Sequence, residues 1–410
     1  MVKLNNIDLT IIGGGPVGLF LGKEAKKKGL NVVIFDREEK VGGILKQCIH
    51  TGFGLQVYNK NLTGPELAEN LYEEVNNLNI PVYTISMCSG FEDKKLYFYS
   101  RRGIIEVESD YYGFALGARE RNRGNLFIGG DRPTGIFTAG FAQYLTNILG
   151  LKIGNKIAIL GSGDIGLIMA RRLKIEGMDV AGVYEIMPFF GGLPRNIKQC
   201  LEDFEIPLYL SHTIIKVEGK DRLEKIFVSE VDKNFNQIGE IKEIEADTLL
   251  LSVGLIPEID ILRKNLLFDK STNQPIVNQN FLTNIPGVFL LGNSLTIFDL
   301  VDKAMLSSLN SLDAILKGKR EINNNGIKLK TGNLIKNLIP QIIEKDSEKA
   351  NIYFRVKEPI FNKSLILRED NKIVFKKKIV ALYPSQMEEI TINPEIIEKD
   401  EVILEIIWKR

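Results

Sequence analysis

Two apolar, strand-like runs predict an α/β protein, because each leads into a G-x-G-x-x-G turn, a helix and a second strand that ends on an acid. The second copy begins at residue 156, and further strand-like runs follow residue 326. We therefore expect two Rossmann-like dinucleotide-binding domains, one inserted in the other, plus a small C-terminal β-rich domain. A chain of 410 residues is long enough for two or three domains. The expected boundaries are residues 1–117 with 258–320, residues 118–257, and residues 327–410.

The first glycine turn, GGGPVG, follows the apolar residues 9–12. In such a turn the first glycine permits a tight bend, the second lets backbone amides approach a pyrophosphate, and the third lets the helix pack on the strand. A helix over 19–28 and a strand over 31–35 lead to Asp36, at the distance where a carboxylate accepts hydrogen bonds from a ribose. A glycine turn without a ligand is the alternative, and the flanking elements favour a nucleotide site. The candidate cofactor-binding residues here are Gly13, Gly15, Pro16, Val17, Gly18, Asp36, Arg37 and Gly43.

The second glycine turn, GSGDIG, follows a strand over 157–160 and precedes a helix over 167–175. The next strand, 180–184, ends on Glu185, and no arginine follows closely. A carboxylate there bonds the 2′-hydroxyl of NAD and repels the 2′-phosphate of NADP, so we expect NADH rather than NADPH. The candidate residues are Gly161, Gly163, Asp164, Ile165, Gly166 and Glu185.

The remaining elements follow in order along the chain. A glycine-bracketed loop over 41–54 precedes an amphipathic helix over 64–77 and strands over 81–86, 96–100, 104–107 and 111–116. After the second turn we expect strands over 208–217, 226–231, 248–253 and 286–291, and a helix over 300–316 with Asp299 and Asp302 as N-terminal caps. A linker over 317–326 then leads to strands over 352–356, 364–367, 373–382 and 402–408, with a hairpin turn at 369–371.

Composition excludes several classes of function. The 53 basic and 52 acidic residues nearly balance, so we expect no nucleic-acid partner. The charge-free run 133–151 has the length of a membrane span but contains a proline, three glycines and polar residues, so we expect a buried segment and no membrane span. No apolar signal segment precedes the first strand. Cys48, Cys88 and Cys200 lie far apart, which predicts neither a metal site nor a disulfide and fits a cytoplasmic protein.

Taken together, these features resemble the flavoproteins with two dinucleotide-binding domains, the superfamily that includes the pyridine nucleotide-disulfide oxidoreductases. The resemblance rests on the two glycine turns with their acids, on a Gly254-x-x-Pro257 junction, and on a late strand that ends in Gly292-Asn293. It implies FAD on the first turn, NAD(H) on the inserted one, and a return of the chain to the flavin ribityl chain at Asn293, whose oxygen can accept a hydroxyl. The candidate residues added on this basis are Gly117, Gly254, Gly292 and Asn293.

The chain also resembles a narrower subgroup of FAD-dependent oxidoreductase subunits. These are related to the flavin subunits of opine, proline and hydrogen-cyanide-forming amine dehydrogenases, and they are often linked with anaerobic glycerol-3-phosphate dehydrogenase. The motifs in question are GGIL at 42–45, QCIH at 47–50, LTGPE at 62–66, RER at 119–121, RP at 132–133, GIFTAG at 135–140 and DLVD at 299–302. Members of the amine-oxidising branch have extra cysteines for an iron–sulfur centre, which this chain lacks. We therefore expect no relay to such a cluster within this subunit.

The candidate catalytic residues are Cys48 and His50, near the expected flavin. Disulfide reductases place two cysteines after the paired glycines, and this chain keeps only Cys48 there, so a dithiol mechanism is excluded locally. Cys48 is either a thiolate beside the flavin or a cysteine that only packs, and His50 is either a proton donor or acceptor or a structural histidine. Two further segments remain open between a functional and a structural interpretation: the loop 191–196, and the arginines Arg119 and Arg121.

The leading hypothesis is an FAD-containing oxidoreductase that passes hydride or electrons between NADH and an acceptor or a partner subunit. The alternatives are the flavin subunit of a substrate dehydrogenase acting on an amine, an opine or glycerol 3-phosphate, and a flavin-bound scaffold without turnover. The expected partners are small-molecule cofactors, a dehydrogenase or electron-acceptor subunit, and a second copy of the chain.

Overall fold

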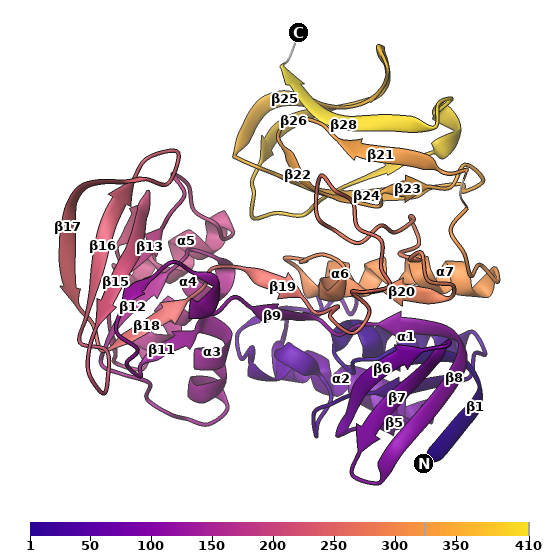
Figure 1. Ribbon diagram of the computed structural model, residues 1–410, viewed down its shortest axis with the longest axis horizontal. Helices are drawn as coiled ribbons and strands as arrows, with labels where there is room; N and C mark the ends of the chain where they lie inside the picture. The colour runs from indigo at the N-terminus through magenta and orange to yellow at the C-terminus, as the bar shows by residue number, and fades with distance from the viewer. Residues whose placement is uncertain (324, 409–410) are drawn as a thin grey trace. The chain divides into compact units, whose positions relative to one another are not determined.

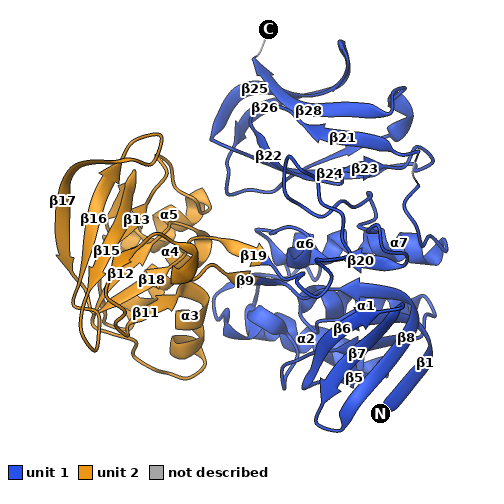
Figure 2. Ribbon diagram, viewed as in Figure 1, with its two compact units in different colours: residues 1–118, 257–410 blue, residues 119–256 orange. Residues whose placement is uncertain are grey.

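The computed structural model describes residues 1–323 and 325–408 (Figure 1). The chain divides into two compact units (Figure 2). Unit 1 comprises Met1–Ala118 with Pro257–Arg410, and unit 2 comprises Arg119–Ile256.

A seven-stranded sheet forms the centre of the N-terminal part of unit 1. Its order is β5-β2-β1-β8-β7-β6, with β20 also paired to β8. β8 runs parallel to β1 along most of its length, and it pairs with β7 in its first half and with β20 near its end. The strands are β1 (Val2–Ile12), β2 (Val32–Phe35), β5 (Val82–Tyr83), β6 (Ser86–Glu92), β7 (Lys95–Ser100), β8 (Gly103–Phe114) and β20 (Val288–Leu290).

The predicted strands 104–107 and 111–116 are one strand, β8. The polar residues 108–110 predicted a break between two strands. In the structure Glu108 and Asp110 are exposed, whereas Ser109 is buried, and its hydroxyl lies 2.5 Å from the hydroxyl of Thr10 in β1, a hydrogen bond. An alternating strand accommodates this pattern, because successive side chains point to opposite faces.

The described part of unit 1 has four helices, together with short 3₁₀ turns. The helices are α1 (Pro16–Lys27), α2 (Gly64–Asn77), α6 (Val301–Ser307) and α7 (Leu309–Leu316), and the 3₁₀ turns are η1 (Gly43–Gln47), η4 (Gly292–Ser294) and η5 (Pro394–Ile396). A small hairpin, β3 (Thr51–Phe53) with β4 (Leu62–Thr63), precedes α2. α2 has the predicted bounds and begins with a capping box between Thr63 and Glu66. The predicted single helix over 300–316 is two helices, because Ser307 and Ser308 donate their hydroxyls to the carbonyls three residues earlier.

The C-terminal part of unit 1 is the expected β-rich region. A five-stranded sheet of order β23-β21-β28-β25-β26 and a three-stranded sheet of order β22-β24-β27 share a core of their own. The strands are β21 (Ile327–Thr331), β22 (Ile335–Ile339), β23 (Ile342–Ile343), β24 (Ala350–Val356), β25 (Ile360–Glu369), β26 (Lys372–Leu382), β27 (Glu388–Ile392) and β28 (Glu401–Trp408).

Unit 2 is built on a parallel five-stranded sheet of order β11-β18-β12-β13-β14, with one apolar cluster on the helix side and another beneath a second, four-stranded sheet. The parallel strands are β11 (Ile136–Thr138), β18 (Thr248–Leu251), β12 (Lys156–Leu160), β13 (Asp179–Glu185) and β14 (Leu208–Leu210). The second sheet has β10 (Gly129–Gly130), β15 (His212–Glu218), β16 (Lys225–Val231) and β17 (Gln237–Glu245). The helices are α3 (Ala139–Asn147), α4 (Asp164–Ile175), α5 (Pro194–Cys200), η2 (Arg123–Asn125) and η3 (Glu202–Phe204), and the short strands β9 (Ala118–Glu120) and β19 (Leu255–Pro257) pair.

The charge-free run 133–151 forms β11 and the nine-residue helix α3. Within residues 1–323 and 325–408, no helix is both long and apolar enough to cross a membrane.

Candidate functional site

The first glycine turn leaves an open, uncapped helix N-terminus in unit 1. Gly13 has a φ of +108°, and a Cβ there would collide with the carbonyl oxygen of Ala115. A Cβ on Gly15, in contrast, would meet nothing within 4 Å. α1 begins with Pro16, has Gly15 as its N-cap residue, and receives no side-chain cap. Free space above unpaired backbone N–H groups at a helix N-terminus is the arrangement that receives a phosphate.

Asp36 fastens the end of β2 to this turn. Its Oδ2 accepts a 2.7 Å hydrogen bond from the Gly14 N–H, and its Oδ1 accepts a 2.8 Å bond from the Glu38 N–H. Burial raises the pKa of Asp36, and these two N–H groups act in the opposite direction. Arg37 points into solvent and pairs with Glu38 at 3.4 Å. The position of Asp36 therefore suits a ribose contact, and that of Arg37 provides only a surface charge.

The paired glycines after Asp36 pack directly on the turn. The Gly42 N–H donates to the Gly14 carbonyl at 2.7 Å, and a Cβ on Gly43 would lie 3.2 Å from the Gly15 Cα. Gly43, Gly15 and Pro16, all predicted to bind a cofactor, thus form one surface.

Cys48 packs at the start of α2 rather than presenting a thiolate. Its Sγ contacts the Ile44 carbonyl at 3.3 Å, and a Cβ on Gly64 would lie 2.9 Å from the Cys48 Cβ. Burial raises the pKa of the Cys48 thiol to about 12. Because a thiol with this pKa is protonated at neutral pH, the geometry favours the packing interpretation.

His50 lies in the same loop, half-buried. Its Nδ1 is 2.9 Å from the Thr51 carbonyl oxygen, and its ring centroid is 5.0 Å from that of Phe53. These contacts orient the imidazole without assigning it a proton-transfer role, which stays a prediction.

The expectation that Asp299 and Asp302 cap a helix is wrong. Leu300 is the N-cap residue of α6 and makes no side-chain cap. The buried Asp302 instead accepts hydrogen bonds from the backbone N–H groups of the loop after His50, at 3.0, 3.2 and 3.2 Å from Gly54, Gln56 and Val57. Asp299 accepts from the Met387 N–H at 2.9 Å and lies 3.4 Å from Arg355. Distant backbone donors thus replace the helix end as partners, and Asp302 orders the loop 54–57, after which the Tyr58 hydroxyl lies 3.5 Å from the Lys23 ammonium of α1.

The late strand returns to the first turn as predicted. Gly292 has a φ of +56°, and a Cβ there would lie 2.8 Å from a methyl of Val17. The Gly117 N–H donates to the Ser294 hydroxyl at 3.0 Å, a contact that the sequence did not reveal. The Asn293 Oδ1 accepts from the Phe298 N–H at 2.9 Å, which leaves one of its two lone pairs for another donor.

The second glycine turn, in unit 2, repeats the design of the first. Glu185 accepts bonds of 2.9 Å from the Ser162 N–H and 3.0 Å from the Met187 N–H, as Asp36 does from Gly14 and Glu38. The Ser162 hydroxyl, which sequence reasoning did not single out, donates to Glu185 at 2.6 Å. α4 has Gly163 as its N-cap residue and no side-chain cap. Gly254 has a φ of +100° with open space around it, and Ile165 packs against the unit 2 core.

The loop 191–196 is tied to this turn by side chains. The Gly191 N–H donates to the Ser162 hydroxyl at 2.7 Å. Asp164 Oδ1 accepts from the Leu193 N–H at 2.8 Å and from the Asn196 amide at 2.6 Å. Asp164, predicted to bind a cofactor, therefore holds the start of α5 against the first turn of α4.

In the segment 119–121, the structure gives the central residue, Glu120, a defined structural role. Glu120 accepts hydrogen bonds of 2.6 Å and 3.3 Å from the N–H groups of Gly140 and Phe141 at the start of α3. The carboxylate compensates the unpaired donors of that helix end.

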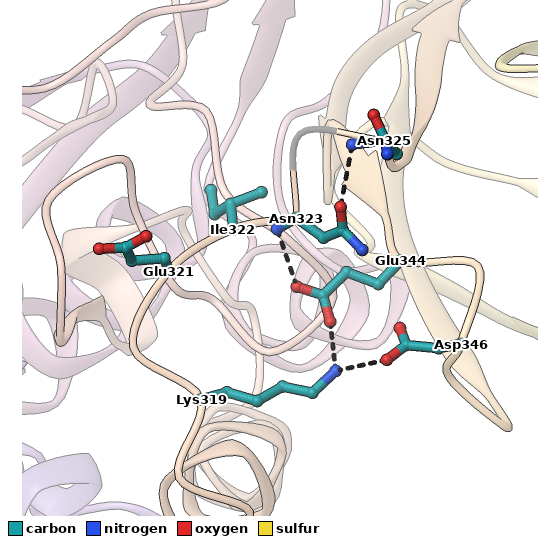
Figure 3. A pocket seen from close by; sticks show the side chains of 7 residues that line it. All are labelled: Lys319, Glu321, Ile322, Asn323, Asn325, Glu344 and Asp346. Carbon is teal, nitrogen blue, oxygen red and sulfur yellow. Dashed lines mark hydrogen bonds and ion pairs between the residues drawn. The ribbon is translucent and has the colours of Figure 1, made fainter.

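A pocket of about 420 Å³ lies at the linker before the β-rich region (Figure 3). Glu344, which is 1% exposed, is held at 2.5 Å by the ammonium of Lys319 and at 2.9 Å by the amide of Asn278. Lys319 also reaches Asp346 at 3.4 Å. Burial lowers the pKa of Lys319, and these carboxylates more than offset it, so the pKa is raised. The Lys319 ammonium thus bridges two carboxylates where the linker meets the β-rich region.

Comparison with known proteins decides the family. The model of the pyridine nucleotide-disulphide oxidoreductase family matches residues 7–308. The chain belongs to this family. The family's members use a flavin and a pyridine nucleotide, so the protein is a flavin-dependent pyridine nucleotide oxidoreductase. The subgroup expected from the shorter motifs stays a prediction.

The relatives of this chain include proteins named as a reductase and as a dehydrogenase. The ferredoxin–NADP reductase of Pelagibacter ubique (strain HTCC1062) is 25% identical over 308 residues, covering 70% of this chain and 84% of that protein. The NADH dehydrogenase of Bacillus subtilis (strain 168) is 23% identical over 291 residues, covering 70% of this chain and 53% of that protein.

Solved structures confirm the predicted fold class. Lactococcus lactis thioredoxin reductase has a TM-score of 0.62 at 17% identity, covering 76% of this chain and 98% of that one. L-proline dehydrogenase from P. horikoshii has a TM-score of 0.54 at 18% identity, covering 78% of this chain and 57% of that one.

Proposed function

We propose that the first glycine turn binds FAD, that the second binds NADH, and that the protein passes hydride from NADH to an acceptor or a partner subunit. The observation that supports this most is the duplicated cradle, in which each turn is fastened to its own buried acid and leads into an uncapped helix. FAD, when bound, supplies the group that accepts and releases hydride. The protein's own part is to bind, orient and shield the two cofactors.

The surroundings of the first turn suit a cofactor that stays bound. Gly43 and Gly292 come from two other segments of the chain, and a Cβ on either would lie within about 3 Å of the turn, at Gly15 or Val17, so the turn is lined on two sides. Free space remains above Gly15, where a pyrophosphate would meet the N-terminus of α1.

Glu185 supports NADH over NADPH. Its carboxylate is 7% exposed and fixed by three hydrogen bonds, so it cannot swing away from a ligand. A 2′-phosphate placed beside it would meet a fixed negative charge, whereas a ribose hydroxyl would find an acceptor.

The chemistry that we propose does not use a cysteine pair. Cys48 has no second cysteine close to it in sequence, and the raised pKa of its thiol argues against a nucleophilic role. The electron acceptor is therefore a molecule or subunit other than an internal disulfide. We also propose that the protein is related to the flavin subunits of opine, proline or glycerol-phosphate dehydrogenases.

An anaerobic spectral titration of the purified protein tests the proposal. We expect a yellow protein that bleaches with NADH, and with NADPH only at much higher concentration. A colourless protein that FAD does not reconstitute would contradict the proposal. Bleaching by an amine, an opine or glycerol 3-phosphate, without a response to NADH, would instead favour a substrate dehydrogenase.

A matched pair of variants separates the two cofactors. Gly15 and Gly163 both have negative φ values that any residue adopts, so an aspartate at either position does not strain the backbone. Gly15→Asp and Gly163→Asp each add one carboxylate where a phosphate would bind. We expect Gly15→Asp to lose bound flavin, and Gly163→Asp to keep its yellow colour but to bleach at far higher NADH concentration. The reverse pattern would exchange the assignments of the two turns.

A further inference from the structure

We propose that unit 2 has a separate binding pocket for a small organic anion, a carboxylate or a phosphate monoester with an apolar body. The cavity has a volume of about 300 Å³. Its walls come from the segment after β9, from the segment before and within β11, and from the end of β18, and they comprise Asn122, Arg123, Gly124, Arg132, Pro133, Ile136, Phe137, Thr138 and Leu251. None of these residues belongs to the second glycine turn, to Glu185 or to the loop 191–196, and the pocket meets the proposed NADH cradle only where Leu251 precedes Ser252, which packs on the turn.

Positive charge at this pocket has no acidic partner. Within residues 1–323 and 325–408, no carboxylate forms an ion pair with Arg123 or Arg132. The charge of Asp131 acts to raise the pKa of Arg123, and the Asp131 carboxylate also accepts a 3.1 Å hydrogen bond from the Gly219 N–H. Burial and the charge of Arg132 both lower the pKa of Arg123, which shows that the two guanidinium groups repel each other. An anion between them would relieve that repulsion.

The Nε–H group of Arg123 is buried without a hydrogen-bond partner among the described residues. The Arg123 Nη2 donates to the carbonyls of Ile128 and Gly129 at 3.4 and 3.2 Å, which fixes the guanidinium plane. A buried donor without a partner is rare and indicates a group that a ligand or a water satisfies. A rigid guanidinium with a free edge suits a carboxylate or phosphate oxygen.

The apolar lining residues of the pocket favour a ligand with an apolar body. Pro133, Ile136, Phe137 and Leu251 form an apolar wall. The Asn122 carbonyl oxygen accepts from the Gly124 N–H, so it does not compete with the anion for the arginine donors. Small-molecule sites combine such walls with a few fixed polar groups, and about 300 Å³ is at the lower end of their size range. The pocket therefore fits a compact amphipathic anion of the size of benzoate or phenyl phosphate, in which an oxyanion faces the arginines.

Calorimetric titration of the full-length protein tests this assignment, because binding heat does not depend on flavin chemistry. The probes are benzoate, phenyl phosphate, inorganic phosphate and the neutral analogue benzamide. We expect one equivalent of benzoate or phenyl phosphate to bind and benzamide not to bind. The tighter of the two anions identifies the oxyanion as a carboxylate or a phosphate, and binding of inorganic phosphate alone would contradict the apolar part of the proposal.

Variants tie the binding to the pocket. Arg132→Gln removes an exposed guanidinium, so it is expected to fold normally and to weaken anion binding roughly tenfold or more. Arg123→Gln is expected to weaken it further, and Arg102→Gln, which removes an exposed arginine of unit 1, serves as the charge-matched control and is expected to change nothing. Unchanged binding in Arg132→Gln, absence of binding at millimolar probe, or displacement of the probe by NADH would each overturn the proposal.

Discussion

The two glycine turns share one hydrogen-bond plan but differ in what surrounds them. In each, a buried acid accepts the N–H of the turn's second residue and the N–H two positions beyond itself. Beyond the Asp36 bonds, Val41 and the paired glycines Gly42 and Gly43 pack on the first turn through apolar and backbone contacts. Around the second turn the hydroxyl of Ser162 and the carboxylate of Asp164 tie down a neighbouring loop. The first turn is thus shaped mainly by packing, and the second by a polar network.

This difference has a functional meaning under the proposed assignment. A cofactor that is kept needs a surface that stays formed, whereas a co-substrate that enters and leaves needs groups that can exchange partners.

Removal of the Asp302 carboxylate is expected to damage the first cradle most. Asp302→Ala would leave three backbone N–H groups of the loop 54–57 without their acceptor. Because a buried donor without a partner costs about 1–3 kcal/mol, and water can reach part of an opened loop, we expect a loss of about 3 kcal/mol in the free energy of unfolding and a protein with little bound flavin. Urea unfolding and the flavin absorbance per protein measure both effects.

Asp302→Asn provides the control for that experiment, since it keeps one oxygen acceptor in the same place. An intermediate loss of stability and of flavin is expected. If both variants kept a full complement of flavin, the loop would have no part in the cradle.

Loss of the Glu185 charge is expected to change the nucleotide preference. Glu185→Gln keeps an oxygen that can accept from the Ser162 N–H but removes the fixed negative charge. We expect the preference for NADH over NADPH to fall about tenfold, which corresponds to about 1.4 kcal/mol. The ratio of kcat/KM for the two nucleotides measures this, and Asp36→Asn, at the equivalent place of the first turn, should leave the ratio unchanged. A ratio unaltered by Glu185→Gln would mean that the adenosine ribose lies elsewhere.

The Cys48 thiol gives a pH-dependent prediction for the first cradle. Its pKa is raised from an ordinary value of 9.0 to about 12, so only the unfolded chain releases this proton as the pH rises above about 9. The stabilising contribution is therefore complete below pH 9 and is lost as the pH rises toward 12. Between pH 7 and 10 we expect the free energy of unfolding of Cys48→Ser to fall by about 1 kcal/mol less than that of the parent protein.

The same variant tests the chemical role of the cysteine. If Cys48 only packs, Cys48→Ser keeps the rate of NADH-driven flavin bleaching, and iodoacetamide labels Cys48 of the native protein slowly at pH 8. Loss of bleaching in Cys48→Ser, with flavin still bound, would restore the thiolate interpretation.

Local sequence patterns predicted the parts of these sites that depend on neighbours in the chain. The glycine turns, Asp36 and Glu185 could be found because strand, turn, helix and acid follow one another within about two dozen residues. Asp302 was assigned to a helix cap because its real partners, Gly54 to Val57, lie about 250 residues away in the sequence. Ser162 and Arg123 had no local signal, since the contact of Ser162 with Gly191 and the proposed role of Arg123 in a cavity that Leu251 also lines both depend on distant residues. Long-range hydrogen bonds and cavities arise from the fold, and no spacing rule in the sequence contains them.

We expect Asp164 variants to change stability and nucleotide binding least. Asp164 marks a difference between the two turns in one residue, because α1 begins with Pro16 and α4 begins with this acid. A carboxylate in the first turn of a helix interacts favourably with the helix dipole by about 0.3–1 kcal/mol, yet it also opposes an incoming pyrophosphate. Asp164→Asn keeps an oxygen for the Leu193 N–H while removing the charge. We expect a loss of about 0.5 kcal/mol in stability and a KM for NADH that falls about twofold. Asp164→Ala also releases the loop 191–196, so a rise in its KM would show that the tether outweighs the charge, and a fall equal to that of Asp164→Asn would show that the loop does not contact the nucleotide.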